Sequence, residues 1–552
     1  MPFTKEKELL SDLLLQKNNQ MKKIFFFLVL MFMISTQAQT TFNYDVVLTP
    51  VNIAGLPGLH SYAFGQHNGK WLIIGGRKDG LHARQPFNSF PETQNNTDIY
   101  VVDVATNQSW SASVNTLPTG LKEQLQSTNM NFYQDETTLY IIGGYGFSAS
   151  SNDHMTYANL TAVDVPGIIN AIVTGTPIAN YFKQLSDQKF AITGGQLGKI
   201  GTTFYLVGGQ QFDGRYNPMS MPTYTQSYSN QIRKFTLDNS GTNLSYANYE
   251  TITDVIHFHR RDYNLLPQVF PNGELGYTIS SGLFQIAADL PFLNPIDIKA
   301  NGYTPQMNFN QYLSNYHSGK VSLYDVNLNQ MHNVFFGGMS QYHYESGSLL
   351  QDDTVPFVKT ISRTTRTASG ELYEYQLPIE MPNLKGAGAE FIYNKALSHY
   401  SNEVIQLTPN LPNEFVIGHL FGGIESSNPS AFTTNQTGQT TADASVYEVK
   451  LVKNNNLNCT QIDGKNPFKI AVYPNPTSTK TVTVAFEMPY ETSVNYYISS
   501  LDGKIVEEGD IEDVHQGNSK MDFTISAAET EIAIITFVFD HKYYVSEKIL
   551  KK

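Results

Sequence analysis

Cysteine, tryptophan and charged residues are all scarce in this chain of 552 residues. It has one cysteine and two tryptophans, and charged side chains occupy 15% of its positions. A single cysteine excludes any disulfide bond within the chain. The charge balance is acidic, with 36 Lys and Arg against 49 Asp and Glu and a net charge of −13. Because nucleic-acid-binding proteins need a basic surface to neutralise phosphates, we expect no nucleic-acid partner.

Long apolar runs are also missing. The run from Ile24 to Ile34 has about half of the roughly 20 residues that cross a bilayer. Lys22 and Lys23 precede this run, and a polar stretch ending in Ala38 follows it, which is the pattern of a secretory signal peptide. Residues 1–38 are therefore predicted to be an N-terminal extension and signal peptide, with Met21 as an alternative start. Cleavage would leave no transmembrane anchor; a retained anchor is the alternative interpretation.

A short apolar segment that ends in Gly-Gly recurs through the middle of the chain. It occurs as WLIIGG (71–76), LYIIGG (139–144), FYLVGG (204–209), NVFFGG (333–338) and GHLFGG (418–423), with a degenerate copy, GYTISSG, at 276–282. The flanking segments alternate apolar and polar residues, which predicts four antiparallel strands in each repeat and no helices. A ring of such four-stranded sheets is a β-propeller, in which each sheet buries its faces against its neighbours.

The repeats resemble those of kelch propellers. In the first repeat a strand of the type IYVVD follows the glycine pair, and Asn107 and Trp110 stand where a kelch repeat ends. The resemblance implies an all-β fold with a six-bladed kelch-like propeller over residues 40–455. A second Gly-Gly pair, at 194–195, leaves seven blades as the alternative. We interpret the glycines as turn and packing residues rather than ligand contacts.

The two ends of the propeller region are both strand-like. Residues 41–50 precede the first glycine pair and residues 444–454 follow the last one. We expect these segments to pair in one closing sheet, which would join the ends of the ring without a disulfide bond.

Most of the length beyond that of a typical kelch repeat follows the glycine pairs. Because the turns of an antiparallel sheet alternate between its two ends, these insertions are expected to share one face, called here the insertion face. The segments that enter each repeat are expected on the same face, and long loops often carry function. The insertions are residues 77–97, 145–155, 210–227, 339–370 and 424–444, and the entering segments include HFHRRDY (257–263), NYHSG (315–319) and SHYSNE (398–403).

Arginine and histidine side chains in these segments are the candidate ligand-binding residues, because guanidinium and imidazole groups bind carboxylates and hydroxyls. The candidates are His259, Arg260, Arg261 and His317 near the expected axis, and Arg77, Arg215, Tyr342 and His343 elsewhere on the insertion face. The alternative role for each is a polar network that only stabilises the ring. We expect neither a metal ion nor a cofactor, because the sequence has no ligand set or nucleotide-binding motif.

The end of the chain carries three short motifs in a fixed order. Residues 456–467 are predicted to be a polar linker, and residues 468–552 a small β-sandwich whose alternating strands are separated by Pro, Asn-Pro and Asp-Gly turns. This region resembles the type A C-terminal sorting domain of the type IX secretion system of Bacteroidetes. The resemblance lies in the opening Tyr473, Pro474, Asn475 and Pro476, the central Asp502, Gly503 and Lys504, and the basic ending KILKK.

The resemblance implies a partner, the type IX secretion machinery, and a route through the periplasm to the outer-membrane surface or the medium. For the propeller the sequence favours a binding module for a glycan or a surface protein. Two alternatives stay open: a propeller enzyme acting on sugars, such as a sialic-acid mutarotase-like isomerase, and a structural component of the secretion or gliding apparatus. No catalytic motif decides between them.

Overall fold

The structure is a computed structural model of the chain that describes residues 42–85, 88–217, 223–454, 458–525 and 532–551. The predicted signal peptide and the alternative start therefore lie outside the described residues. The chain divides into two units, Met1–Phe42 and Asn43–Lys552, and all the described strands and helices belong to the second unit.

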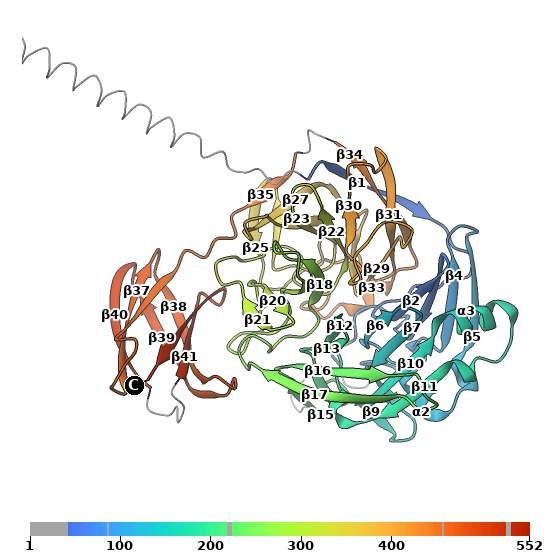
Figure 1. The fold of residues 1–552 in the computed structure, drawn as a ribbon, viewed down its shortest axis with the longest axis horizontal. Helices are drawn as coiled ribbons and strands as arrows, with labels where there is room; N and C mark the ends of the chain where they lie inside the picture. The colour runs from blue at the N-terminus through green and yellow to red at the C-terminus, as the bar shows by residue number, and fades with distance from the viewer. Residues whose placement is uncertain (1–41, 86–87, 218–222, 455–457, 526–531, 552) are drawn as a thin grey trace, which may run out of the picture. The chain divides into compact units, whose positions relative to one another are not determined.

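Six sheets, each built on four antiparallel strands, follow one another along the chain (Figure 1). The first three contain β2 (Ala63–His67), β3 (Lys70–Ile74), β4 (Asp98–Asp103) and β5 (Gln108–Ser113); β6 (Asn131–Asp135), β7 (Thr138–Ile142), β10 (Asn159–Asp164) and β11 (Phe182–Ser186); and β12 (Gln196–Ile200), β13 (Thr203–Val207), β16 (Gln231–Asp238) and β17 (Ser245–Thr253). Each recurring Gly-Gly segment in them ends the second strand, as the sequence predicts.

The last three sheets have the same order of strands. They contain β18 (Asn264–Val269), β19 (Leu275–Ser280), β20 (Ile296–Lys299) and β21 (Gly302–Pro305); β22 (Gly319–Asp325), β23 (Gln330–Phe336), β26 (Thr360–Arg366) and β27 (Leu372–Glu380); and β29 (Glu390–Tyr393), β31 (Glu414–Phe421), β34 (Val446–Lys453) and β1 (Tyr44–Val51). The predicted insertion 339–370 ends too late. Its last part contains β26 (Thr360–Arg366), which is a strand of the fifth sheet.

The sixth sheet takes its outer strand from the other end of the chain. β1 pairs antiparallel with β34 along its whole length, from Tyr44 opposite Lys453 to Val51 opposite Val446. The expected closing sheet is therefore confirmed.

Backbone hydrogen bonds join the first strands of the six sheets into a closed ring, called here the inner ring. One residue just before each first strand donates its N–H to the carbonyl of its counterpart in a neighbouring sheet, over 2.8 to 3.2 Å. The six members are Ser61, Asn129, Gly194, Asp262, His317 and Gly388. The ring closes with six members, and Gly194 is one of them, so the second Gly-Gly pair begins the third sheet rather than an additional blade.

A second closed set of hydrogen bonds, called here the glycine ring, runs through the glycine pairs. The second glycine of each pair donates its N–H to a carbonyl of the next sheet, for example Gly144 to Ile192 at 3.1 Å and Gly423 to Leu59 at 2.9 Å. In the fourth sheet Gly282 fills this position, and Ser281 adopts a positive φ of 58° beside it. The closed ring of four-stranded sheets is consistent with the blades of a β-propeller.

The apolar faces of neighbouring sheets share their cores. Leu72 and Ile74 of the first sheet pack with Leu139 and Ile141 of the second, and Ile142 and Leu160 of the second sheet pack with residues of the third. Tyr205 of the third sheet packs with Tyr277 of the fourth in the same manner. Burial between the sheets therefore accompanies the two hydrogen-bonded rings around the axis.

Two short helices depart from the all-strand prediction. α2 spans Thr119–Leu125, and α3 spans Val165–Thr174 between the third and fourth strands of the second sheet. Asp164 caps the start of α3, and Gly175 ends it with a φ of 70°. Its buried face, which includes Ile168, Ile169 and Ile172, covers the core between the first two sheets. Among the described residues no helix is long and apolar enough to cross a membrane.

Most of the insertions fold as small sheets of their own. These are β8 (Tyr145–Ser148) with β9 (Asp153–Thr156), β14 (Gln210–Gly214) with β15 (Tyr224–Tyr228), β24 (Tyr342–Glu345) with β25 (Ser348–Gln351), and β28 (Leu384–Ala387) with β32 (Ile424–Ser426) and β33 (Thr440–Ala442). The insertions lie beside the entering segments, as expected, because bridges join His60 to Arg77, Thr128 to Tyr145 and Arg261 to Leu283.

The predicted linker is partly a strand. Its described part includes β35 (Thr460–Ile462), which pairs with the outer strand of the fifth sheet, β27, and buries Ile462. A further strand, β30 (Ile405–Leu407), pairs in parallel with β22 on the inner edge of the same sheet. The fifth sheet therefore has six strands.

The C-terminal region contains two antiparallel sheets that bury a common core. One has β36 (Lys469–Tyr473), β37 (Thr481–Met488) and β40 (Gly517–Thr524), and the other has β38 (Thr492–Ser500), β39 (Ile505–Val514), β41 (Ile532–Phe539) and β42 (Tyr543–Leu550). Phe486 from the first sheet and Ile535 and Phe537 from the second meet in this core. The arrangement is consistent with the expected β-sandwich.

The glycine ring makes a direct prediction for stability. Gly143 has a φ of 66°, and a Cβ atom there would lie 1.8 Å from the carbonyl oxygen of Ile192 in the next sheet. We expect Gly143→Ala to lower the free energy of unfolding by at least about 2 kcal/mol, because backbone strain adds to the clash. Gly241→Ala is the control, since its Cβ would meet no atom within 4 Å. Chemical denaturation measures both, and equal stability of the two variants would contradict the prediction.

Candidate functional site

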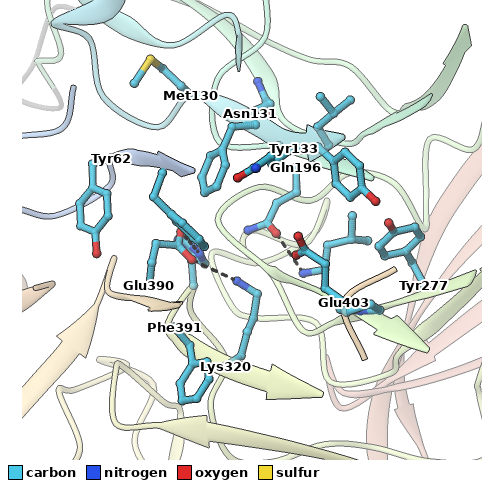
Figure 2. Close-up of a pocket in the computed structure, with 18 of the residues that line it drawn as sticks. Tyr62, Met130, Asn131, Tyr133, Gln196, Tyr277, Lys320, Glu390, Phe391 and Glu403 are labelled. Carbon is cyan, nitrogen blue, oxygen red and sulfur yellow. Dashed lines mark hydrogen bonds and ion pairs between the residues drawn. The ribbon is translucent and has the colours of Figure 1, made fainter. Parts of the chain in front are cut away.

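The first strands of the six sheets surround a cavity of about 160 Å³ on the axis (Figure 2). Its lining comes from β2, β6, β12, β18, β22 and β29 together with five members of the inner ring. A cavity of about 150 Å³ holds benzene, whereas drug-sized ligands occupy pockets of about 300 Å³ or more. The space therefore suits one small ring or a few water molecules.

One layer of the cavity wall is apolar at five of its six positions. Each position lies three residues after an inner-ring member, so the six side chains are structurally equivalent. The five apolar members are Phe64, Phe132, Leu197, Leu265 and Phe391, and the sixth is Lys320. A charged residue in an otherwise apolar layer needs a partner, because burial of a lone charge is costly.

Glu390 is that partner. Its Oε2 lies 3.8 Å from Lys320 Nζ, and its Oε1 lies 3.1 Å from His317 Nε2 (Figure 2). Burial opposes ionisation of Glu390, but Lys320 and His317 outweigh it and hold the pKa of this carboxyl below its usual value. Burial also lowers the pKa of Lys320, and Glu390 opposes that shift. The cavity therefore contains an ionised carboxylate between two nitrogen groups.

A second carboxyl group, Asp262, lines the same end of the cavity. It is a member of the inner ring and has a positive φ of 51°, which is uncommon for a residue other than glycine. Burial raises the pKa of Asp262, although Arg261, His317 and a hydrogen bond from the Tyr316 hydroxyl oppose the shift. Asp262 and Glu390 thus have opposite pKa shifts within one cavity.

The loop between β29 and β31 lines the opposite end of the cavity. The Tyr133 hydroxyl donates to the Ser401 carbonyl at 3.4 Å, and the Asn402 amide donates to the Gln268 carbonyl at 2.9 Å. Glu403 of this loop faces the cavity near Tyr133 and Tyr277 (Figure 2). Burial raises its pKa against the opposing effects of Lys395, His399 and a hydrogen bond from Tyr393.

The structure corrects the placement of the SHYSNE segment, residues 398–403. We expected it to enter a repeat on the insertion face, but it follows the first strand of the sixth sheet and lies at the other end of the cavity. The sequence reading failed because the short strand β29 (Glu390–Tyr393) was not recognised, and the loop was assigned to the wrong side of it.

Two of the eight candidate residues, Arg260 and Arg77, have structural partners throughout. Arg260 is fully buried and donates to three carbonyls, those of His257, Ser281 and Asn294, at 2.8 to 2.9 Å. Burial lowers its pKa to about 9. Arg77 directs both Nε and Nη2 to Asp79 and directs Nη1 to Asn95. Neither guanidinium lines the axial cavity.

His317 is a member of the inner ring, and Arg261 directly precedes another member, Asp262. His317 lines the cavity beside Glu390. Arg261 lies on the other side of the inner ring, where its guanidinium stacks on Phe284 with 4.8 Å from its central carbon to the ring centroid. His259 stacks on Tyr228 at 3.8 Å, and burial together with Arg261 lowers its pKa to about 4.

The remaining candidates are spread over the insertions. Arg215 Nε donates to the Ser89 carbonyl at 2.9 Å. Tyr342 is buried in β24 and donates its hydroxyl to Gln351 at 2.9 Å, and His343 follows it in the same strand. The structure therefore does not bring the eight residues together in one site, and their role as ligand contacts stays a prediction.

The aromatic residues of the insertions pack on one another. Phe212 contacts Tyr145 and Tyr224 at centroid distances of 5.3 and 4.6 Å, and His82 stacks on Phe90 at 4.7 Å. The exposed large apolar side chains of the described residues include no aromatic ring from the insertions; Tyr473 and Tyr490 belong to the C-terminal region. The insertion face thus offers little aromatic surface for a sugar to stack on.

The opening motif of the C-terminal region contacts the basic ending, and the central motif forms a turn. Asn475 of the opening motif donates to the Lys548 carbonyl at 2.7 Å and accepts from the Leu550 N–H at 3.0 Å, so it holds the basic ending of the chain. Asp502, Gly503 and Lys504 form the turn between β38 and β39, where Gly503 has a φ of 78° and Ser500 bonds Lys504. These contacts give both motifs a structural role.

Comparisons with known proteins give matches to solved structures only. No protein-family model and no curated protein sequence matches the chain. Among solved structures, one titled "Structure of YjhT" is similar over 74% of this chain and 99% of its own, with 10% sequence identity and a TM-score of 0.41.

Sequence reasoning missed four of the residues that carry charge into the cavity or close to it. They are Asp262, Lys320, Glu390 and Glu403. A signal was present for Lys320, because alignment of the six entering segments would have placed it in register with five phenylalanine or leucine residues. No such signal marks Glu403, which comes from an irregular loop.

The ion pair in the cavity predicts a pH-dependent loss of stability. Lys320→Met should cost about 3 kcal/mol at pH 7, because it leaves Glu390 buried with less compensation. The stabilisation linked to Glu390 is present above its usual pKa of 4.5 and is lost as the pH falls below that value, so the cost should shrink toward pH 4.

Denaturation at pH 7 and pH 4 measures this effect. The double variant Lys320→Met/Glu390→Gln is the control and should recover most of the stability at pH 7. A single variant as stable as the wild type at pH 7 would contradict the assigned ion pair.

Proposed function

We propose that this protein is an exported kelch-like propeller that binds a small hydroxylated ligand, of the size of one sugar ring, in its axial cavity. The observation that carries the proposal is the cavity itself, where an apolar layer lies beside the Glu390 ion pairs. It favours a binding module for glycan components, the function that the sequence also favours.

The chemistry of the wall suits a sugar. The rings of Phe64, Phe132 and Phe391 can pack against the C–H groups of a pyranose, while carboxylate and ammonium groups bond its hydroxyls. A protein ligand on the insertion face is less well supported, because the aromatic residues there pack on one another. The same holds for a structural component of a secretion or gliding apparatus, which no contact of the described residues favours.

A second candidate is an isomerase of the sialic-acid mutarotase type. The opposite pKa shifts of Glu390 and of Asp262 or Glu403 favour it, because a pair of carboxyls with separated pKa values can act as base and acid. Mutarotation requires only proton transfer to and from the ring oxygen and the anomeric hydroxyl. It would need no metal ion or cofactor.

Titration of the protein with a panel of monosaccharides, observed by ligand NMR, tests the proposal. Phe64→Leu should weaken binding of the best ligand by about fivefold to tenfold, because it removes an aromatic face from the cavity. Phe147→Leu is the matched control, since Phe147 lies in β8 and does not line the cavity.

Binding that is unchanged in Phe64→Leu, or absent for every sugar, would overturn the proposed site. The same spectra measure the exchange between anomers. Acceleration of that exchange, lost in Glu390→Gln while binding persists, would favour the isomerase over the binding module.

We also propose that the C-terminal region directs export through the type IX secretion system to the outer-membrane surface or the medium. The resemblance of its motifs supports this, and the contacts of Asn475 with Lys548 and Leu550 explain why two distant motifs occur together. In a host with this system, a chain ending at residue 467 should accumulate in the periplasm, as measured by fractionation. Release of the shortened chain at the normal level would contradict the proposal.

A further inference from the structure

A cluster of basic and aromatic residues lies on the insertion face, on the side of the inner ring away from the axial cavity. Its members are His82, Arg84, Tyr216, Tyr228, Arg261 and Phe432. The residues that precede the ring members, Arg261 among them, form bridges with the start of the insertions there. The insertion of the first sheet extends toward the same place, because His82 contacts Tyr216 of the third sheet at 4.6 Å and Phe432 of the sixth at 5.4 Å. Residues of the first, third and sixth sheets therefore meet at His82.

Two arginines of this cluster lack a full set of partners. The Nε atom of Arg84 is buried and has no hydrogen-bond partner among the described residues, and the same is true of the Nε of Arg261. The nearest acidic oxygen to the Nε of Arg261 is that of Asp262, at 3.7 Å, which is too long for a hydrogen bond. Unsatisfied buried donors are rare in proteins and call for an explanation.

Aromatic rings support both guanidinium groups. The central carbon of Arg84 lies 5.4 Å from the centroid of Phe432, and that of Arg261 lies 4.8 Å from Phe284 and 5.9 Å from Tyr228. Both arginines oppose the rise that burial causes in the pKa of Tyr216, so both guanidinium groups lie within electrostatic range of its hydroxyl. Stacking holds a guanidinium in plane and leaves its edge free to donate hydrogen bonds.

The other charged groups of the cluster are engaged. Asp79 accepts two hydrogen bonds from Arg77 and lies 3.9 Å from His60, so it is not available to Arg84. Arg215 donates its Nε to the Ser89 carbonyl. Burial lowers the pKa of His82 to about 4, and Arg261 and Arg77 contribute to the shift. Two further carboxylates face the cluster: Asp262 lies 3.7 Å from Arg261, and Asp289 acts on Tyr216 and Tyr228.

We propose that Arg84 and Arg261 form an oxyanion-binding site that takes the carboxylate or phosphate group of a small ligand. Two guanidinium groups with free donors match the planar, bidentate geometry of such a group. The site goes beyond the function proposed for the axial cavity, because it lies on the other side of the inner ring and uses none of the charged residues of the cavity.

Calorimetric titration of the full chain with inorganic phosphate and, separately, with glucuronate tests the site. We expect Arg84→Gln and Arg261→Gln each to weaken binding of either probe by about tenfold, because each removes charge-assisted hydrogen bonds. Wild-type affinity should fall as salt is added. Lys78→Gln is the matched control: it removes one positive charge from an exposed position of the same insertion as Arg84 and should change the affinity by less than twofold.

Thermal unfolding of each variant verifies that it folds. Absence of saturable binding of both probes to the wild type, or equal losses in Lys78→Gln, would overturn the site. Titration with glucose separates this proposal from the previous one. If the protein binds glucose, binds glucuronate no more tightly than glucose and does not bind phosphate, the axial cavity is supported and the arginine site is refuted. If the protein binds phosphate through Arg84 and Arg261 but does not bind glucose, the arginine site is supported and the sugar site in the axial cavity is refuted.

Discussion

The two closed rings of hydrogen bonds between neighbouring sheets are the constraint on which the rest of this structure depends. In the inner ring, six residues that are far apart in sequence each donate to the next around the axis, from Ser61 to Gly388. In the glycine ring, the second residue of each glycine pair donates to the following sheet. Both rings need a close approach of two backbones, and a closed ring has a fixed number of members.

This constraint explains why glycine recurs while most other positions vary. A Cβ at Gly143, Gly422 or Gly337 would come within 1.8 to 2.2 Å of a carbonyl of the adjacent sheet. The repeat therefore has to retain the glycine and the apolar strand before it, whereas residues that point into the cavity are free to differ. Lys320 in a layer of phenylalanine and leucine side chains is a result of that freedom, and function in a repeated architecture is expected at such departures.

The features that repeat were predictable from the sequence, and those that depend on register were not. Five recurring glycine pairs and the degenerate copy at Ser281 and Gly282 identified the second strands of the six sheets, and the alternation at residues 41–50 and 444–454 identified the closing sheet. Each of these follows from local periodicity. The helix α3 was missed although Asp164, Pro166 and Gly175 mark its ends, because the period-two strands on either side dominated the reading.

The site was less predictable because its members are defined by position in a ring rather than by neighbours in sequence. Arg260 and Arg261 are adjacent, yet the first is fully buried against carbonyls and the second keeps a buried donor without a partner. A pattern of basic residues could not separate them, since the difference arises from which side of the strand entrance each side chain occupies. The same reasoning separates Arg77, which Asp79 neutralises, from Arg84, seven residues further along the same insertion. What distinguishes Arg84 and Arg261 from Arg77 and Arg260 is a buried Nε donor that no described residue satisfies.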